Sequence, residues 1–239
     1  MKLNFQDVYE TLASTSDEQQ LFNRIASYAA RLGFDYCCYG IRAPLPVSNP
    51  AVSIFETYPN GWMERYHRQG YLNIDPTVRA GSQDPQLIIW PEPNGEVSSS
   101  LWADACDFGL RFGVAQSSWS TRGAFGLLTL SRRTRALATT EIELLRQPIH
   151  WLANLSHTMM TPYLLPKLTP KIDEALTARE REVLCWTGEG KTAYETGLIL
   201  NISERTVNFH INNAMTKLSA TNKVQAVVKA TAMGLLNAA

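Results

Sequence analysis

The chain has 239 residues, of which 45% are apolar and 18% are charged, a length that allows one large domain or two ordinary ones. This apolar content is enough for packed cores and excludes a wholly disordered or collagen-like chain. The 22 basic residues balance the 22 acidic ones, which argues against a generally basic nucleic-acid coat but allows a small basic surface.

Neither a membrane segment nor a metal site is visible in the sequence. The longest apolar runs are far shorter than the roughly 20 residues of a membrane span, and the first ten residues contain no apolar core of a secretory signal. The four cysteines and four histidines are not spaced as metal ligands. We therefore expect a cytoplasmic protein with no membrane partner, no metal, no cofactor and buried free thiols.

Three prolines, Pro162, Pro166 and Pro170, predict a break between two domains. Proline removes a backbone N–H and disfavours a helical residue before it, so this segment favours an extended connector. We predict an N-terminal domain over residues 1–162, a linker over residues 163–174 and a C-terminal domain over residues 175–239.

The N-terminal part is predicted to mix helices and strands. A capping box at Ser16 and Gln19 begins a helix that ends at Gly33, and Thr140 with Glu143 begins a long helix near the end of this part. Strands are predicted over residues 34–42, 51–57, 86–90, 111–120 and 124–133, and short helices over residues 61–69, 76–81 and 101–108. The predicted fold class is α+β, with an α/β/α sandwich around one antiparallel sheet joined to a C-terminal four-helix helix-turn-helix domain.

The C-terminal part is predicted to contain four helices with short connections. Thr177 and Glu180 form a capping box for the first, residues 191–200 form the second, and Ser203 caps a third that runs to about Leu218. The fourth begins at residues 221–223, and its predicted inward residues are Val224, Val227, Val228 and Thr231. Two short helices joined by about three residues are typical of a helix-turn-helix.

The third of these helices has an apolar stripe and a polar arc. At about 100° per residue, the stripe consists of Val207, Ile211, Ala214 and Leu218. The opposite arc consists of Arg205, Phe209, Asn212 and Thr216, with Asn208 on its flank. Arginine pairs with guanine and asparagine with adenine in the major groove, while Phe209 fits a thymine methyl group or a neighbouring helix. From periodicity alone, DNA binding and a packing module with a polar outer face both fit.

The region between residues 58 and 119 combines many aromatic side chains with few polar ones. Its members are Tyr58, Trp62, Tyr66, Tyr71, Asp75, Thr77, Trp90, Trp102, Phe112 and Trp119. Trp62 and Tyr66 share one face of a helix, and Asp75 can place its carboxylate at a helix start because Pro76 follows it. Such a region fits a small-molecule pocket, and it also fits an aromatic core with one hydrogen-bonded aspartate.

The C-terminal part resembles the helix-turn-helix domain of the LuxR-type transcription factors. The opening LTARERE, the W-x-x-x-GKT turn, ISERTVNFH and the closing ATNKVQAV carry this resemblance. It implies binding to double-stranded promoter DNA, with base contacts at Asn208 and Asn212, where several family members carry arginine. It also implies a homodimer formed through the fourth helix that reads a palindromic site. The implied phosphate contacts are Lys191, Thr192, Ser203, Arg205, Thr206 and Lys223.

The N-terminal part resembles the autoinducer-binding domain of quorum-sensing LuxR-type regulators, in particular β-proteobacterial ones. The segments TYPNGWMERYHRQGYLNIDPTVRAG, GAFGLLTLSRR, GFDYCCYGIR and GVAQSSW carry this resemblance. It implies an N-acyl-homoserine lactone as the ligand. The implied contacts are Trp62 to the lactone carbonyl, Asp75 (supported by Thr77) to the amide N–H, Tyr58 and Thr129 to the acyl carbonyl, Tyr66 and Trp90 against the lactone ring, and Cys38, Gly40, Val52, Ile54, Val78 and Leu110 along the acyl tail.

Other classes of protein fit the sequence less well. A phospho-acceptor receiver domain needs a parallel βαβ array, but the first predicted strand ends in Arg42 and a proline-rich loop. A lactone-hydrolysing enzyme would need an H-x-H-x-D-H cluster or a G-x-S-x-G motif, and the sequence contains neither, so no catalytic residue is predicted. The alternative that stays open is a LuxR-type regulator that responds to a non-lactone signal or acts without a ligand.

Overall fold

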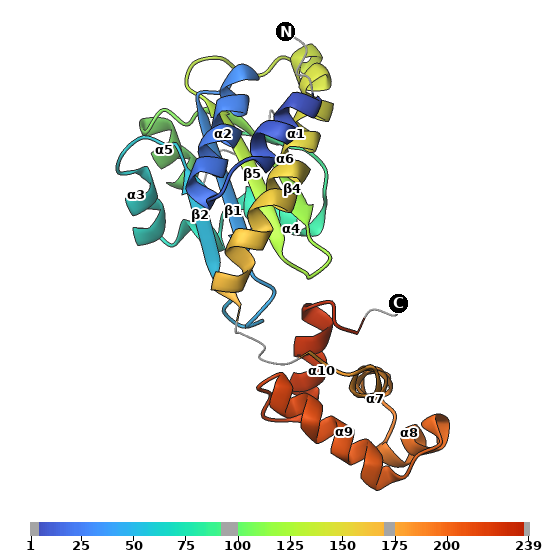
Figure 1. Cartoon of the computed structure of the whole chain (residues 1–239). Helices are drawn as coiled ribbons and strands as arrows, with labels where there is room; N and C mark the ends of the chain where they lie inside the picture. The colour runs from blue at the N-terminus through green and yellow to red at the C-terminus, as the bar shows by residue number, and fades with distance from the viewer. Residues whose placement is uncertain (1–4, 92–99, 170–174, 237–239) are drawn as a thin grey trace. The chain divides into compact units, whose positions relative to one another are not determined.

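The computed structural model describes residues 5–91, 100–169 and 175–236. The chain divides into two compact units, and Leu168 ends the first of them. The first unit is a five-stranded sheet with helices on both faces, and the second consists of short helices (Figure 1). The predicted α+β class is therefore confirmed. Among the described residues, no helix combines the length and the apolar character that a membrane crossing requires.

The sheet of the first unit is antiparallel throughout. Its strands are β1 (Tyr36–Arg42), β2 (Val52–Glu56), β3 (Ile88–Trp90), β4 (Phe112–Trp119) and β5 (Phe125–Arg132). They lie in the order β2-β1-β5-β4-β3, and β1 pairs with both β2 and β5. The predicted hairpin between β4 and β5 is present, with Trp119 opposite Phe125. The strands that the sequence predicts are thus confirmed as parts of one sheet.

Helices cover the two faces of the sheet in two groups (Figure 1). The first group is α2 (Glu18–Arg31) and α6 (Thr139–Leu168), with α1 (Phe5–Ala13), a helix that the sequence does not predict, packed on both. On this face, the Tyr39 hydroxyl of β1 forms a 2.8 Å hydrogen bond with Nδ1 of the buried His157 in α6. The second group is α3 (Trp62–Arg68), the 3-10 helix η1 (Tyr71–Asn73), α4 (Pro76–Gln83) and α5 (Ser100–Asp107).

Two predicted helix starts are wrong, by one residue for α2 and by two for α6. Helix α2 is capped by Asp17, whose carboxylate accepts from the Gln20 N–H at 2.8 Å, and not by the box of Ser16 and Gln19. A carboxylate is favoured at the positive end of a helix, so Asp17 takes the position that Ser16 was expected to fill. Helix α6 begins at Thr139, so Thr140 lies inside its first turn and does not cap it with Glu143.

The sequence predicts that three prolines mark the break between the two domains. Helix α6 continues through two of them. Pro162 and Pro166 lie inside it, so the first six residues of the predicted linker are helical. Both prolines are exposed, whereas Met160 and Leu164 are buried. Burial of this apolar face outweighs the loss of two backbone hydrogen bonds. The residues 170–174, which include the third proline, lie outside the described part of the chain.

The second unit contains α7 (Ala178–Gly188), α8 (Ala193–Leu200), α9 (Glu204–Lys217) and α10 (Lys223–Ala232). The predicted capping box of Thr177 and Glu180 is present, and Ser203 caps α9 by accepting from the Thr206 N–H at 3.1 Å. Between α8 and α9 the chain turns at Asn201, whose φ of 53° is a left-handed conformation that asparagine tolerates. The predicted helix-turn-helix is therefore confirmed.

The buried face of α10 differs from the prediction. The residues expected to point inward are Val224, Val227, Val228 and Thr231. Instead, Ala226 and Ala230 are fully buried, while Val224 and Val228 are 65% and 42% exposed. Thr231 is exposed as well, and Val227 is half-buried. Small side chains let α10 pack closely on α7 and α9, which leaves the two valines as an apolar patch on its outer face.

Gly126 of β5 lies so close to α6 that a Cβ atom there would collide with the His157 imidazole ring. Gly126→Ala should therefore overpack the first unit and lower its free energy of unfolding by about 1–3 kcal/mol. Gly40→Ala in β1 is the matched control, because a Cβ there would approach Ile54 Cγ1 at 4.0 Å and no closer atom. Urea denaturation measures both variants, and equal stabilities would contradict this packing.

Candidate functional sites

The register of the sheet brings six of the predicted ligand-site residues to one face. Side chains alternate between the two faces along a strand, and directly paired residues share a face. Cys38 pairs with Thr129, Gly40 pairs with Ile54, and Arg42 pairs with Val52. Trp90 pairs with Gly113, which lies opposite Ser131, so it belongs to the face that also carries Thr129. This face, here called the pocket face, is the one covered by α3, α4 and α5.

Aromatic side chains from α3 and the strands pack together on the pocket face. Trp62 and Tyr66 are buried with Trp90 and Leu110 in one cluster, against which the partly buried Tyr58 and Val78 pack. The Trp62 and Tyr66 rings meet edge to face, with centroids 5.8 Å apart. This cluster contains six of the predicted ligand-site residues, and the predicted strand residues outside it lie on the same face of the sheet. Two members of the aromatic run, Phe112 and Trp119, are not in this cluster.

Asp75 is held in a fixed orientation at the start of α4. Its Oδ1 accepts from the Thr77 N–H at 2.8 Å and from the Thr77 hydroxyl at 2.7 Å, and its Oδ2 accepts from the Tyr66 hydroxyl at 2.9 Å. A carboxylate has about four acceptor positions, so one stays open for a further donor. Burial and the adjacent Asp75 carboxylate raise the pKa of Tyr66 well above its usual value, which keeps this phenol protonated as a donor.

Several hydrogen-bond donors of the pocket face have no protein partner. Within the described residues, the Trp90 Nε1 is buried without a hydrogen bond, and no partner is found for the Trp62 indole N–H or the Thr129 hydroxyl. The Tyr58 hydroxyl lies beside the Cys38 thiol, and burial raises the pKa of that thiol to about 12. The wall therefore presents unused donors around one strong acceptor, which is an arrangement that fits a polar head group on an apolar molecule.

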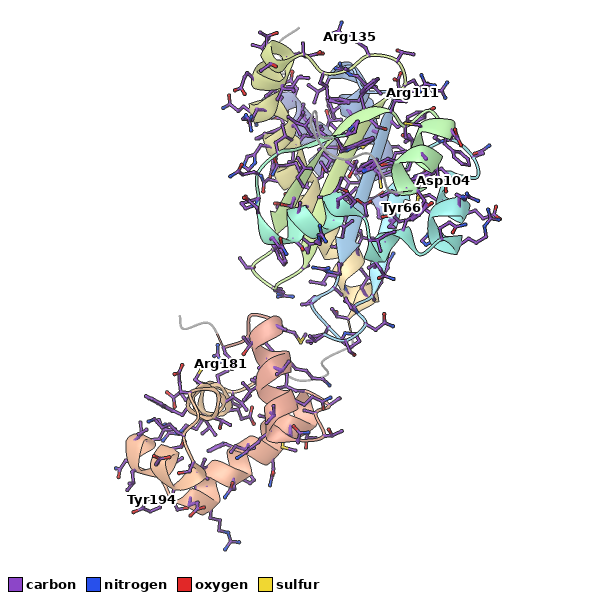
Figure 2. The ribbon with its side chains drawn as sticks, turned by 180° about the vertical axis from the view of Figure 1, so that it is seen from behind. Tyr66, Asp104, Arg111, Arg135, Arg181 and Tyr194 are labelled. Carbon is purple, nitrogen blue, oxygen red and sulfur yellow. The ribbon has the colours of Figure 1, made fainter. Side chains whose placement is uncertain are left out.

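Two charged residues beside this cluster are not predicted from the sequence. Arg65 of α3 donates two hydrogen bonds to Asp104 of α5, at 2.6 and 3.0 Å, and the Tyr71 hydroxyl donates to the same carboxylate at 2.6 Å. Figure 2 shows Asp104 in the same region of the first unit as Tyr66. The partners are 39 and 33 positions apart in the chain, so no local spacing signals their contact.

Helix α9 of the second unit presents the predicted polar arc to the surface. Val207, Ile211, Ala214 and Leu218 are buried, as the periodicity predicts. On the opposite side, a shallow depression is lined by Glu204, Arg205, Asn208, Phe209 and Asn212. Phe209 is 59% exposed, so it is not buried against a neighbouring helix. This face can enter a groove of a nucleic acid because its amide and guanidinium groups are open to solvent.

The predicted phosphate contacts lie at the starts of helices or on exposed loops. Thr192 and Ser203 are the N-caps of α8 and α9, and the Ser203 hydroxyl is 2.8 Å from that of Thr206. The other three, Lys191, Arg205 and Lys223, are exposed. By contrast, Lys217 binds the Glu180 carboxylate at 3.0 Å, and Lys229 donates to the carbonyls of residues 218 and 219. Lys191, Arg205 and Lys223 are therefore available to an anion, whereas Lys217 and Lys229 are engaged within the second unit.

No group of three histidine, cysteine, aspartate or glutamate side chains within the described segments could hold a metal ion.

Comparison with known families matches residues 17–160 to the autoinducer binding domain and residues 174–230 to the luxR family of bacterial regulatory proteins. The transcriptional activator protein SolR of Ralstonia nicotianae is 63% identical over 232 residues, covering 97% of this chain and 98% of SolR.

Solved structures share the same architecture. SdiA of Escherichia coli in complex with octanoyl-rac-glycerol aligns with a TM-score of 0.81 at 29% identity, covering 100% of this chain and 99% of SdiA. CepR2 of Burkholderia cenocepacia, described as an N-acylhomoserine lactone dependent LuxR family transcription factor, aligns with a TM-score of 0.62 at 34% identity, covering 66% of this chain and 94% of CepR2. The chain therefore belongs to the LuxR family of transcriptional regulators, with an autoinducer-binding domain followed by a DNA-binding helix-turn-helix domain.

Proposed function

We propose that this regulator binds an N-acyl-homoserine lactone on the pocket face of its first unit. The observation that carries the proposal is the Asp75 carboxylate, which three hydrogen bonds hold in place beside unpartnered donors. The amide N–H of a lactone ligand is a donor that needs an acceptor in an apolar cavity, and an ionised carboxylate binds it more strongly than a neutral group. The lactone carbonyl and the acyl carbonyl in turn need donors.

The two carbonyl groups and the amide N–H of such a ligand each have a matching group. The Trp62 indole N–H donates to the lactone carbonyl, Asp75 accepts from the amide N–H, and Tyr58 and Thr129 donate to the acyl carbonyl. Tyr66 and Trp90 pack against the lactone ring. Thr77 acts indirectly, because it orients the Asp75 carboxylate.

The acyl tail extends from this head group along Cys38, Gly40, Val52, Ile54, Val78 and Leu110. The packing around Gly40 supports this path. A glycine in the middle of a strand costs stability, and here a Cβ would have only Ile54 Cγ1, at 4.0 Å, as a neighbour. Other glycines of the sheet, such as Gly113 and Gly126, have no room for a Cβ. The space over Gly40 therefore fits an alkyl chain.

The second unit binds a palindromic promoter site as a homodimer. Asn208 and Asn212 contact base edges, and Lys191, Thr192, Ser203, Arg205, Thr206 and Lys223 contact phosphates. The exposed patch of Val224 and Val228 on α10 supports the homodimer, since these residues are one helical turn apart and a twin helix would cover them.

The ligand acts as a missing part of the core. Without it, the aromatic wall lacks packing contacts and its donors lack partners, so the unliganded first unit is less stable. Binding stabilises the folded state in proportion to ligand concentration and shifts the population toward the dimer that binds DNA. The protein works as a regulator in the cytoplasm, where bacterial promoters lie, and it has no enzymatic role in this mechanism.

A second candidate ligand is an acylated glycerol. The SdiA structure contains octanoyl-rac-glycerol, and that protein aligns over 100% of this chain. A glycerol ester offers carbonyl and hydroxyl oxygens to the donors of the pocket face, but it has no amide N–H for Asp75. The lactone is favoured for that reason.

Removal of the Asp75 carboxylate is the first test of the proposed function. Asp75→Asn keeps the cap of α4 but places an amide opposite the ligand N–H, so the affinity for acyl-homoserine lactones should fall about 5- to 150-fold. Calorimetry measures the affinity, and mass spectrometry identifies the small molecule that copurifies with each protein.

Asp17→Asn is the matched control, because it alters the cap of α2 without touching the pocket face. Unchanged lactone affinity in Asp75→Asn, or an acylglycerol as the copurified molecule, would contradict the lactone assignment.

The tail path over Gly40 predicts a change in chain-length preference. Gly40→Val should occupy the space intended for the tail, so long acyl chains should lose about tenfold or more in affinity, while short chains lose little. Binding of a series of lactones that differ only in tail length measures this effect. A uniform loss across the series would show that the tail runs elsewhere.

The base contacts and phosphate contacts of α9 predict different responses to substitution. Asn208→Ala and Asn212→Ala should each cost about 1–3 kcal/mol at the preferred site and relax its sequence specificity. Lys191→Ala should weaken binding to all sequences similarly and reduce the salt dependence. Gel-shift titrations at several salt concentrations separate the two patterns. Specificity retained in both asparagine variants would contradict the proposed base contacts.

A further inference from the structure

Asp104 forms a hydrogen-bonded cluster that none of the ligand contacts above includes. It lies in α5, its side chain is 16% exposed, and it accepts from Arg65 Nε, Arg65 Nη2 and the Tyr71 hydroxyl. The Arg65 guanidinium and the Tyr71 hydroxyl lower the pKa of Asp104 to about 2, so the carboxylate is charged throughout the neutral range. A bidentate arginine–carboxylate pair is also directional, which fixes geometry as well as supplying attraction.

The partners of Asp104 connect directly to the proposed head-group site. Arg65 lies in α3 between Trp62 and Tyr66, so its position sets that of both aromatic rings. Tyr71 stacks on Trp62, with ring centroids 6.4 Å apart, and its backbone carbonyl accepts from the Asp75 N–H at 2.8 Å. The Asp104 cluster therefore holds the helix that carries the proposed lactone contacts and the turn that leads to Asp75.

Helix α5 also packs against the aromatic residues of the site. Leu101 and Ala105 are buried in the same cluster as Trp62 and Tyr66. Trp102 stacks on Trp90, with ring centroids 5.3 Å apart and planes inclined by 22°. Helix α5 has only eight residues, and the two hydrogen bonds between Asp104 and Arg65 link it to α3. One carboxylate thus joins the elements that carry four of the aromatic residues of this cluster, Trp62, Tyr66, Tyr71 and Trp102.

We propose that Asp104 is a positioning residue for recognition of the ligand head group. Through Arg65 and Tyr71 it fixes α3 and the turn before Asp75, and through α5 it fixes Trp102 against Trp90. The inference rests on the proposed lactone function and adds a residue that touches no ligand atom. Preorganised contacts lose less freedom on binding, so the cluster strengthens head-group contacts and leaves the acyl-tail contacts of β1 and β2 unchanged.

The test compares Asp104→Asn and Tyr71→Phe with the parent in the full-length protein. Dissociation of an N-acyl-homoserine lactone should become about 5- to 30-fold faster in Asp104→Asn and less so in Tyr71→Phe, which removes one hydroxyl and keeps the ring stack. The preference for the lactone over a cyclopentyl amide with the same acyl chain should shrink, because the lactone carbonyl depends on the position of Trp62. The preference among acyl-chain lengths should not change.

Glu143→Gln is the matched control, since it removes a carboxylate from an exposed ion pair with Arg146 in α6, on the opposite face of the sheet. It should leave both the dissociation rate and the head-group preference unchanged. If the parent binds lactones but Asp104→Asn and Tyr71→Phe keep its rate and its head-group preference, this inference alone is overturned. An equal loss of affinity for every ligand would also overturn it, because that pattern indicates general destabilisation. If the parent binds no lactone, the proposed function and this inference fail together.

Discussion

The Asp75 carboxylate is the constraint on which the first unit depends. One oxygen closes the first turn of α4 through Thr77, and the other accepts from Tyr66 of α3. The same group therefore ends the loop before α4 and fixes the rotamer of a buried tyrosine. It also keeps one acceptor position open for the proposed ligand. Asp75 is half-buried, and a charge withdrawn from water is costly unless it is hydrogen-bonded, so Thr77 and Tyr66 support the site together with the carboxylate itself.

The sequence predicts most of the architecture because its local signals agree with one another. Strand alternation, the capping box of Thr177 and the seam of Val207 and Ile211 all lie where local rules place them. The face of α10 is predicted wrongly because apolarity ranks valine above alanine, whereas close helix packing selects the smaller side chain. The prolines of α6 mislead for a related reason, since tertiary burial outweighs local helix propensity.

The candidate ligand site could be anticipated residue by residue only through the resemblance to a family. Composition and spacing alone leave both interpretations open and favour an ordinary aromatic core over a pocket. The structure adds the register, which places Gly40, Ile54 and Thr129 on one face. It also adds the contact between Arg65 and Asp104, which pairs residues far apart in the chain and has no local signal. Long-range ion pairs of this kind depend on how helices approach one another, which periodicity does not encode.

His157, on the face of the sheet opposite the pocket, has a consequence for acid tolerance. Burial lowers the pKa of His157 to about 4, so the imidazole bonded to Tyr39 is neutral in the folded protein, whereas an unfolded chain takes up a proton below about pH 6.5. This folded-state pKa is depressed, so the contribution of His157 to stability is complete above pH 6.5. It is lost as the pH falls toward 4, by about 3 kcal/mol at most. Acidification of the cell interior therefore weakens the sensory half of this regulator even when its signal is abundant.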